Sequence, residues 1–260
     1  MLHSANKLRG FAIAATDGEL GSIKDVYFDD AGWVIRYLVV NTGGWPNGFD
    51  VLLSPRSVLD EEWEHRALRV DLTMQQIKNS PSIDTAKPVS RQHEEEFNTY
   101  YGYPFYWAGP HRGSAVFPGV IEKKPLEPAD VLAIRKRLEE EQANADPHLR
   151  SCSDVVGYHI HATDGQIGHV EDFLFDRTDW SIQLMAVDTR KWLLGKHVLI
   201  SPRQIERVSW EDKSVFVNVT RNQVEHSPEY DAAHPPESGA ELEMMYRVER
   251  LGSQRPPSHR

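Results

Sequence analysis

Residues 15–29 of this chain read ATDGELGSIKDVYFD, and residues 162–176 read ATDGQIGHVEDFLFD. The likeness extends well beyond this phrase. When the sequence is shifted by 147 positions, residues 4–84 align with residues 151–231 without a gap, and 30 of the 81 positions are identical. Because only two copies occur, the pattern indicates a duplicated domain rather than a long repeat array.

Each copy is predicted to be rich in β-strand. In the first copy, residues 8–15, 20–29, 33–41, 48–55 and 67–72 are candidate strands, and the equivalent residues of the second copy follow the same pattern. Asp17-Gly18 lies between the first two strands, where the Asp-Gly pair is typical of a type I′ hairpin turn. Thr73 is a predicted N-cap of a short helix that ends before Pro81.

Short strands at hairpin spacing form a sheet that must protect its edges, and closure achieves this in about 80 residues. We therefore expect a mainly β fold with two small barrels, and a two-sheet sandwich is the alternative. The predicted organisation is a first repeat at 1–84, a helical and aromatic insertion with linker at 85–150, a second repeat at 151–231, and a short helix with a polar tail at 232–260. Within the insertion, residues 129–143 read as an amphipathic helix.

Composition limits the possible partners. The formal net charge is −10, whereas nucleic-acid binding and attraction to anionic membranes both need basic surface. No stretch approaches the roughly 20 apolar residues of a membrane-spanning helix. Cys152 is the only cysteine, which excludes an internal disulfide and favours a cytoplasmic location. The sequence thus predicts no nucleic-acid binding and no membrane insertion.

The repeated phrase, continued by a W-x-I strand and the strands VLLSP and VLISP, resembles the PRC-barrel family. That family is named for the cytoplasmic domain of the photosynthetic reaction-centre H subunit. The resemblance covers both repeats and extends to bacterial proteins with an aromatic segment after the first barrel. It implies a non-enzymatic module that docks to other proteins, with no catalytic residues and no cofactor.

The shared carboxylates could suggest an acidic catalytic site, but their spacing opposes it. Asp25 and Asp29 are four residues apart on one strand, which separates them by about 13 Å. Asp17 is expected in a turn, and Arg56 could neutralise one of the other two carboxylates. Ser54, in the repeated SPR sequence, is expected to end a strand because no nucleophile-elbow context surrounds it.

Three histidines occur only in the second repeat: His159, His161 and His169 replace Ala12, Ala14 and Ser22. His159 and His161 alternate along one strand and so face the same side. Three histidines can hold zinc with one open position. A metal or small-ligand sensor is therefore the alternative function, although surface histidines without a metal also fit the pattern.

The aromatic run YYGYPFYW lies outside the repeat. Aromatic side chains bury large areas at low entropic cost and dominate binding hot spots. The run could pack internally, associate with a second copy in a homodimer, or bind an unidentified protein. The residues proposed for partner binding are Tyr100, Tyr101, Tyr103, Phe105, Tyr106 and Trp107.

Overall fold

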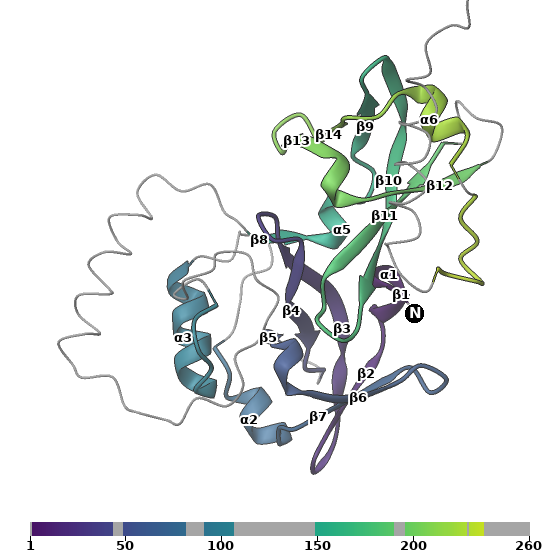
Figure 1. The fold of residues 1–260 in the computed structure, drawn as a ribbon. Helices are drawn as coiled ribbons and strands as arrows, with labels where there is room; N and C mark the ends of the chain where they lie inside the picture. Colours follow the sequence, from purple (N-terminus) through teal and green to yellow (C-terminus); the bar gives the residue numbers. More distant parts are fainter. Residues whose placement is uncertain are drawn as a thin grey trace, which may run out of the picture. The chain divides into compact units, whose positions relative to one another are not determined.

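The computed structural model describes residues 2–43, 49–81, 91–106, 149–189, 196–227 and 229–236 (Figure 1). Residues 129–143 and Trp107 lie outside these ranges. The chain divides into two compact units: unit 1 comprises Met1–Lys7 and Cys152–Arg260, and unit 2 comprises Leu8–Ser151. The units therefore do not follow the linear order of the repeats, since each contains a few residues that come from the other half of the chain.

Unit 2 is built on one seven-stranded sheet. Along the sheet, six strands follow the order β5-β4-β3-β2-β7-β6, and β8 also pairs with β3. The strands are β2 (Ala12–Ala15), β3 (Gly18–Asp29), β4 (Val34–Asn41), β5 (Asp50–Leu53), β6 (Val58–Glu62), β7 (Ala67–Val70) and β8 (Leu149–Ser151). The 12-residue strand β3 pairs through its first part with β2 and through its last three residues with β8.

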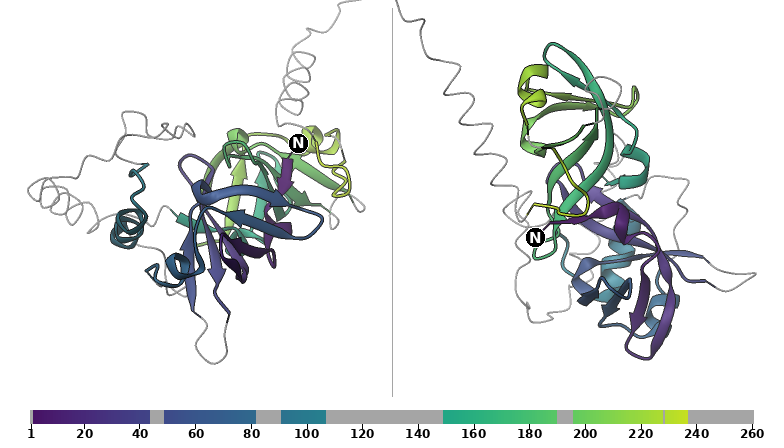
Figure 2. Two further views of the ribbon diagram at one scale, coloured as in Figure 1. Left: turned by 90° about the horizontal axis from the view of Figure 1, so that it is seen from below. Right: turned by 90° about the vertical axis from the view of Figure 1, so that its right-hand side faces the viewer.

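Unit 1 repeats this plan with the order β12-β11-β10-β9-β14-β13, and β1 pairs with β10. The strands are β1 (Leu2–Ser4), β9 (His159–Ala162), β10 (Gly165–Asp176), β11 (Ile182–Asp188), β12 (His197–Ile200), β13 (Ile205–Ser209) and β14 (Ser214–Val217). Figures 1 and 2 show the N-terminal strand, in purple, alongside the green strands of this unit.

The fold is mainly β, as predicted, but the sheets are not closed barrels. In the described parts of the chain no ladder joins β5 to β6 or β12 to β13. A 3₁₀ turn, η1 (Pro55–Ser57), connects β5 to β6, and η2 (Pro202–Gln204) is its counterpart. Each turn brings the following strand to β7 or β14 instead of back to β5 or β12, so each sheet stays open.

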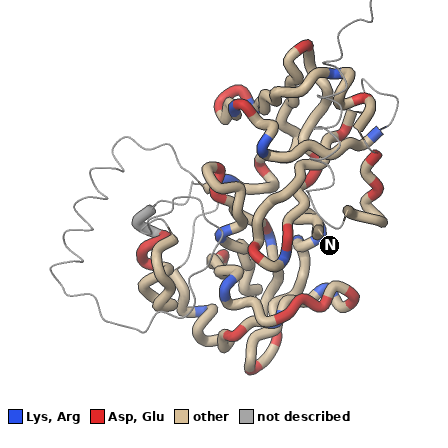
Figure 3. Tube along the Cα trace, viewed as in Figure 1, with Lys and Arg blue, Asp and Glu red and all other residues tan. Residues whose placement is uncertain are grey.

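Two pairs of strands were not predicted. β6 and β13 carry charged side chains, and Figure 3 shows the acidic residues that run along β6 toward β7. β1 and β8 have only three residues each. In both cases the alternation of apolar and polar residues is too weak or too short to indicate a strand.

Four short helices frame the sheets: α1 (Ala5–Leu8), α2 (Met74–Lys78), α5 (Cys152–Val155) and α6 (Arg221–Glu225). The predicted N-caps are confirmed. The Thr73 hydroxyl accepts a hydrogen bond from Gln76 N–H, the Gln76 side chain accepts one from Thr73 N–H, and the same capping box occurs at Thr220. Neither Thr16 nor Asp17 has positive φ, so the predicted type I′ turn is wrong. The Asp17 carboxylate instead accepts the N–H of Met74 at the start of α2.

Each copy of the repeated phrase holds a glycine at which a Cβ atom would overlap the neighbouring strand. Gly21 has φ +58°, and a Cβ atom there would lie 1.8 Å from the carbonyl oxygen of Asn41. At Gly168 the corresponding distance, to the Asp188 carbonyl oxygen, would be 2.1 Å. The long strand therefore approaches its neighbour more closely than any side chain permits.

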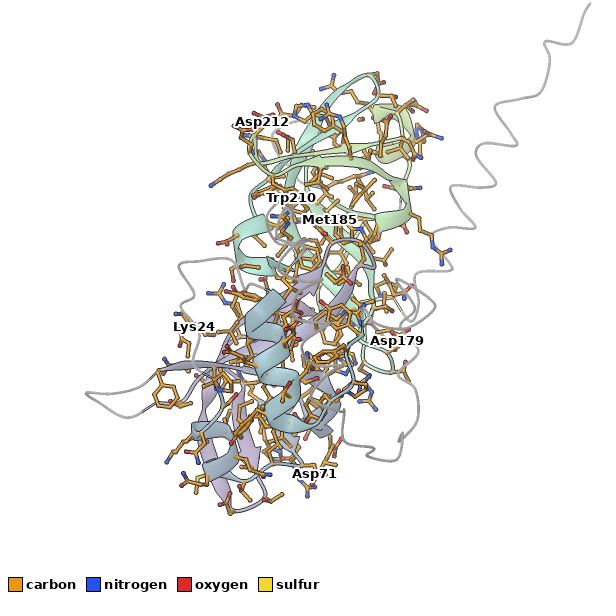
Figure 4. All side chains as sticks on the ribbon, turned by 90° about the vertical axis from the view of Figure 1, so that its left-hand side faces the viewer. Lys24, Asp71, Asp179, Met185, Trp210 and Asp212 are labelled. Atoms are coloured by element: carbon orange, nitrogen blue, oxygen red, sulfur yellow. The ribbon has the colours of Figure 1, made fainter. Side chains whose placement is uncertain are left out.

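The core of each unit lies against its sheet. Met185, labelled in Figure 4, is fully buried in unit 1, whereas Lys24 of unit 2 extends outward to an ion pair with Asp50 at 2.7 Å. Trp33 and Trp180 occupy equivalent positions with positive φ, and each stacks on a buried phenylalanine of its own unit, Phe28 or Phe175. Aromatic packing thus holds the same strained turn in both repeats.

Candidate functional site: an aromatic platform and a histidine strip

Helix α3 (Arg91–Tyr101) packs on the sheet of unit 2 through Phe97. The Phe97 side chain is fully buried, and its ring meets the ring of Tyr37 edge to face at 5.1 Å. The cluster around it consists of Tyr27, Tyr37, Val39, Leu52, Phe97 and Leu149. Helix α3 is therefore a structural part of unit 2.

The tyrosines that follow Phe97 form a connected series of rings. Tyr101 contacts Phe97 at 4.8 Å and stacks on Tyr103 at 5.5 Å with an interplanar angle of 14°. Tyr100 meets Tyr101 edge to face at 4.8 Å. Tyr101 and Tyr103 are partly buried, whereas Tyr100 is 42% exposed. We call Tyr100, Tyr101, Tyr103, Phe105 and Tyr106 the aromatic platform.

Hydrogen bonds fix the platform on the unit. The hydroxyls of Tyr100 and Tyr101 both donate to the Gln76 carbonyl oxygen, at 3.0 and 3.4 Å. Asn98 donates to the Glu94 carbonyl oxygen at 2.7 Å and to the Tyr37 hydroxyl at 3.3 Å. Rings held in this way lose little further freedom on binding a partner.

The far end of the platform covers a buried ion pair. Arg36 and Asp29 are both largely buried, and their charged atoms lie 3.1 Å apart. The Arg36 guanidinium lies 4.1 Å from the centre of the Tyr106 ring, and the Tyr106 hydroxyl donates to Glu94 at 2.8 Å. The ion-pair partner of Asp29 is thus Arg36, whereas the sequence suggested that Arg56 could neutralise either Asp25 or Asp29.

Burial dominates the titration of the platform. It raises the pKa of Tyr101 to about 12 and also raises the pKa of Tyr103. Arg56 lies close enough to Tyr103 to oppose the second shift, and burial lowers the pKa of Arg56 itself. Both phenols remain neutral near pH 7, as ring packing against apolar side chains requires.

Among the residues predicted to bind a partner, the structure brings five together and gives them unequal exposure. Tyr100 is exposed, and Tyr101, Tyr103, Phe105 and Tyr106 are half-buried. Trp107 lies outside the described residues. The run therefore packs on its own unit and leaves Tyr100 exposed.

The shared aspartates have structural partners. Asp17 and Asp164 accept the first N–H of α2 and α6, at 2.7 and 2.8 Å. Asp25 accepts the hydroxyl of Ser151, and Asp172 accepts the hydroxyl of Ser4, each at 2.5 Å.

Asp172 is one of the buried aspartates. Burial raises its pKa, and hydrogen bonds from Ser4, from Asn6 N–H and from Phe173 N–H oppose that shift. The carboxylate therefore holds together the end of β1, the start of α1 and the middle of β10. Ser54 and Ser201 cap the turns η1 and η2 by accepting the N–H of Arg56 and Arg203, which agrees with the predicted turn role.

The histidines of unit 1 do not form one cluster. His159 and His169 face each other across β9 and β10 with ring centres 4.8 Å apart, and the Gln166 amide lies 2.9 Å from His159 Nδ1. His161 instead stacks on Phe216 at 5.0 Å. No group of three or more potential metal ligands occurs in the described ranges, so the three-histidine zinc site is wrong in its ligand set.

Sequence reasoning missed the neighbours of these histidines. Arg207 lies 3.5 Å from the centre of the Phe216 ring, and Phe216 pairs with His161 across β14 and β9. We call Arg207, Phe216, His161, His159 and His169 the histidine strip. Their counterparts in unit 2 are Asp60, Arg69, Ala14, Ala12 and Ser22. Comparing the repeats strand by strand would have found Phe216 and Arg207 as well.

Comparison with known proteins identifies the domain. Residues 2–73 match the family model of the PRC-barrel domain. The first repeat is therefore a PRC-barrel domain, and the matched range includes strand β1. No curated protein matches the chain. In the part of the chain that the structure describes, no helix is long and apolar enough to cross a membrane.

Proposed function

We propose that this chain is a non-enzymatic protein-interaction and assembly module built on two PRC-type units in tandem, acting in the bacterial cytoplasm. The tandem arrangement is supported by the equal strand order of the two sheets and by their 30 shared residues. The resemblance to the reaction-centre H subunit, whose cytoplasmic domain gave the family its name, favours docking over chemistry.

One observation carries the proposal: the aromatic platform is fixed on unit 2 and leaves Tyr100 exposed. An exposed ring that is already immobilised binds a protein surface without a large loss of side-chain entropy. Tyrosine also combines a broad apolar face with a polar hydroxyl, which explains its enrichment at binding hot spots. A protein partner or a second copy of the chain would both fit this surface.

The shared carboxylates support a non-enzymatic role. A general acid or base needs a carboxylate free to exchange a proton with a substrate. Asp17 caps a helix, Asp25 binds Ser151, and Asp29 pairs with Arg36. Each is occupied by a structural contact inside unit 2.

The test compares three full-length proteins as affinity baits: wild type, Tyr100→Ser and the control Leu59→Ser. Leu59 is 62% exposed on β6 of the same unit, so its replacement removes a similar apolar surface elsewhere. We expect at least one protein to be captured by wild type and by the control but to be reduced about tenfold by Tyr100→Ser. Sedimentation of the same proteins measures self-association. If capture and oligomeric state are equal for all three, the platform is not an interaction surface.

A second candidate function rests on the facing pair His159 and His169. Two imidazoles opposed across a sheet can chelate a divalent transition metal, and the Gln166 amide can orient the His159 ring. Calorimetric titration with Zn²⁺ or Ni²⁺ alone tests this. Binding lost in His159→Ala and His169→Ala but kept in His65→Ala, an exposed histidine of unit 2, favours a metal sensor. Equal titration curves for all variants exclude this site.

A further inference from the structure

Each sheet contains a strand from the other repeat. β1, at the start of the first repeat, pairs with β10 of unit 1, and β8, 147 residues later, pairs with β3 of unit 2. The two strands occupy equivalent positions: Ser4 lies opposite Leu174, and Ser151 lies opposite Tyr27. The repeats have therefore exchanged their first strands reciprocally.

The contacts that hold the two strands are nearly the same. Leu2 and Leu149 are both buried, and Ser4 and Ser151 donate to Asp172 and Asp25. These contacts would form equally well if each strand paired with its own repeat. They therefore hold a strand but do not decide which strand enters which sheet.

The middle residue of each strand differs. In β8 this residue is Arg150, and its Nε lies 2.9 Å from Asp30 Oδ2 with both side chains largely buried. In β1 it is His3, and the residue equivalent to Asp30 is Arg177. The pKa of His3 is lowered, first by burial and second by the positive charge of Arg177. Arg177 therefore lies near His3.

Charge thus distinguishes the exchanged from the unexchanged arrangement. If each strand paired with its own repeat, Arg150 would approach Arg177, and Asp30 would exchange its ion pair with Arg150 for a position opposite His3. Like charges at a partly buried site repel each other, and a buried charge that loses its partner is destabilising. His3 tolerates Arg177 because a histidine with lowered pKa is neutral near pH 7.

We propose that β3 and β10 are docking sites for a strand with the sequence Leu-x-Ser. Arg150 and Asp30 select the strand that comes from the opposite repeat. The resulting exchange of strands keeps the two halves of the chain assembled without a covalent link. This inference stands apart from the proposed function, since it concerns the chain's own strands and not the platform or an external partner.

The test uses the full-length protein with a protease site inserted between Gly113 and Ser114. After cleavage, we expect the two fragments to elute together in size-exclusion chromatography, since each supplies a strand to the other's sheet. Separation of the wild-type fragments under native conditions would overturn the proposal.

Charge reversal then tests the selection. In the cleaved protein, Arg150→Glu and Asp30→Arg should each weaken fragment association about tenfold or more, and the double variant should restore it to within about threefold. Lys78→Glu, an equal charge change at an exposed position of α2, is the control and should have no effect. If the double variant is as weak as the product of the two single effects, Arg150 and Asp30 do not select the strand.

Discussion

Strand β4 of unit 2 and strand β11 of unit 1 occupy equivalent places in two sheets of the same order, yet they carry different side chains. Arg36 and Tyr37 of β4 hold Tyr106 and Phe97 of the aromatic segment, whereas Gln183 and Leu184 stand at the equivalent positions of β11. Leu184 has no hydroxyl to accept a hydrogen bond such as the one Asn98 donates to Tyr37.

The residues that the two repeats share, in contrast, make the same contacts in both units. Gly21 and Gly168 permit the same close approach, and Asp25 and Asp172 bind the same serine of an incoming strand. Shared residues therefore build the sheets, and differing residues determine what each sheet carries. Changes at shared positions should affect the two units alike, and changes at differing positions should affect one unit.

The largest effect is expected at the shared glycines. Gly21→Ala and Gly168→Ala each place a Cβ within about 2 Å of a backbone oxygen, so each should destabilise its own unit by about 4 kcal/mol or more. Hydrogen exchange of peptides from each unit measures this separately. Gly43→Ala, where the nearest atom lies 3.9 Å away, is the control for a glycine with positive φ. Normal protection of unit 2 in Gly21→Ala would contradict the packing described here.

Phe97→Ala should destabilise unit 2 and leave unit 1 unchanged, because the cluster around Phe97 lies within unit 2. Removing a fully buried phenylalanine costs about 3–5 kcal/mol. Hydrogen exchange should increase in α3 and in β4 and β5, while peptides of unit 1 keep their protection. A uniform increase in both units would show that α3 does more than cover unit 2.

Asp25→Ala and Asp172→Ala should have similar effects on their respective units. Each removes the carboxylate that accepts a serine hydroxyl, that of part-buried Ser151 or of buried Ser4, and the expected loss is about 1–3 kcal/mol. Denaturant unfolding measures the loss. Ser4→Ala should cost less in the Asp172→Ala background than in the wild type, since only its hydrogen bond from Lys7 N–H then remains to be lost. Fully additive losses of unfolding free energy would contradict a direct hydrogen bond between Ser4 and Asp172.

Alkaline pH should destabilise the aromatic platform, because the Tyr101 hydroxyl then loses its proton. Its pKa is raised from 10.0 to about 12 in the folded protein, so the folded state holds the proton more strongly than the unfolded state. The stabilising contribution is present below pH 10 and is lost as pH rises through 12. In Tyr101→Phe, unit 2 should lose this dependence. Tyr230 in unit 1 also has a pKa raised to about 12, so Tyr230→Phe should act on unit 1 alone.

The sequence predicted the duplicated β fold and the helix caps because these depend on local signals. Asp-Gly, the SPR turns and Thr73 act on their near neighbours. Closed barrels were not confirmed, because closure depends on where η1 directs the chain after β5. The strand exchange could not be predicted, since Leu2–Ser4 carries no pattern that distinguishes pairing with β3 from pairing with β10.

The candidate site was predicted in composition but not in arrangement. The aromatic run was recognised, yet the place of Tyr106 on Arg36 required the fold to bring together two residues that are 70 positions apart in the sequence. The three histidines were recognised as specific to one repeat, but the pairing of His159 with His169 depends on the bulge in β10. The place of His161 on Phe216 depends on the parallel pairing of β9 with β14.

Cross-linking tests the exchanged arrangement most directly. Two double-cysteine variants in a Cys152→Ser background, His3→Cys with Arg177→Cys and His3→Cys with Asp30→Cys, are treated with a short bismaleimide and analysed by peptide mass spectrometry. The exchanged strand predicts efficient linking of positions 3 and 177, which lie in the same unit. Efficient linking of positions 3 and 30 would show that β1 pairs with its own repeat, which contradicts the account.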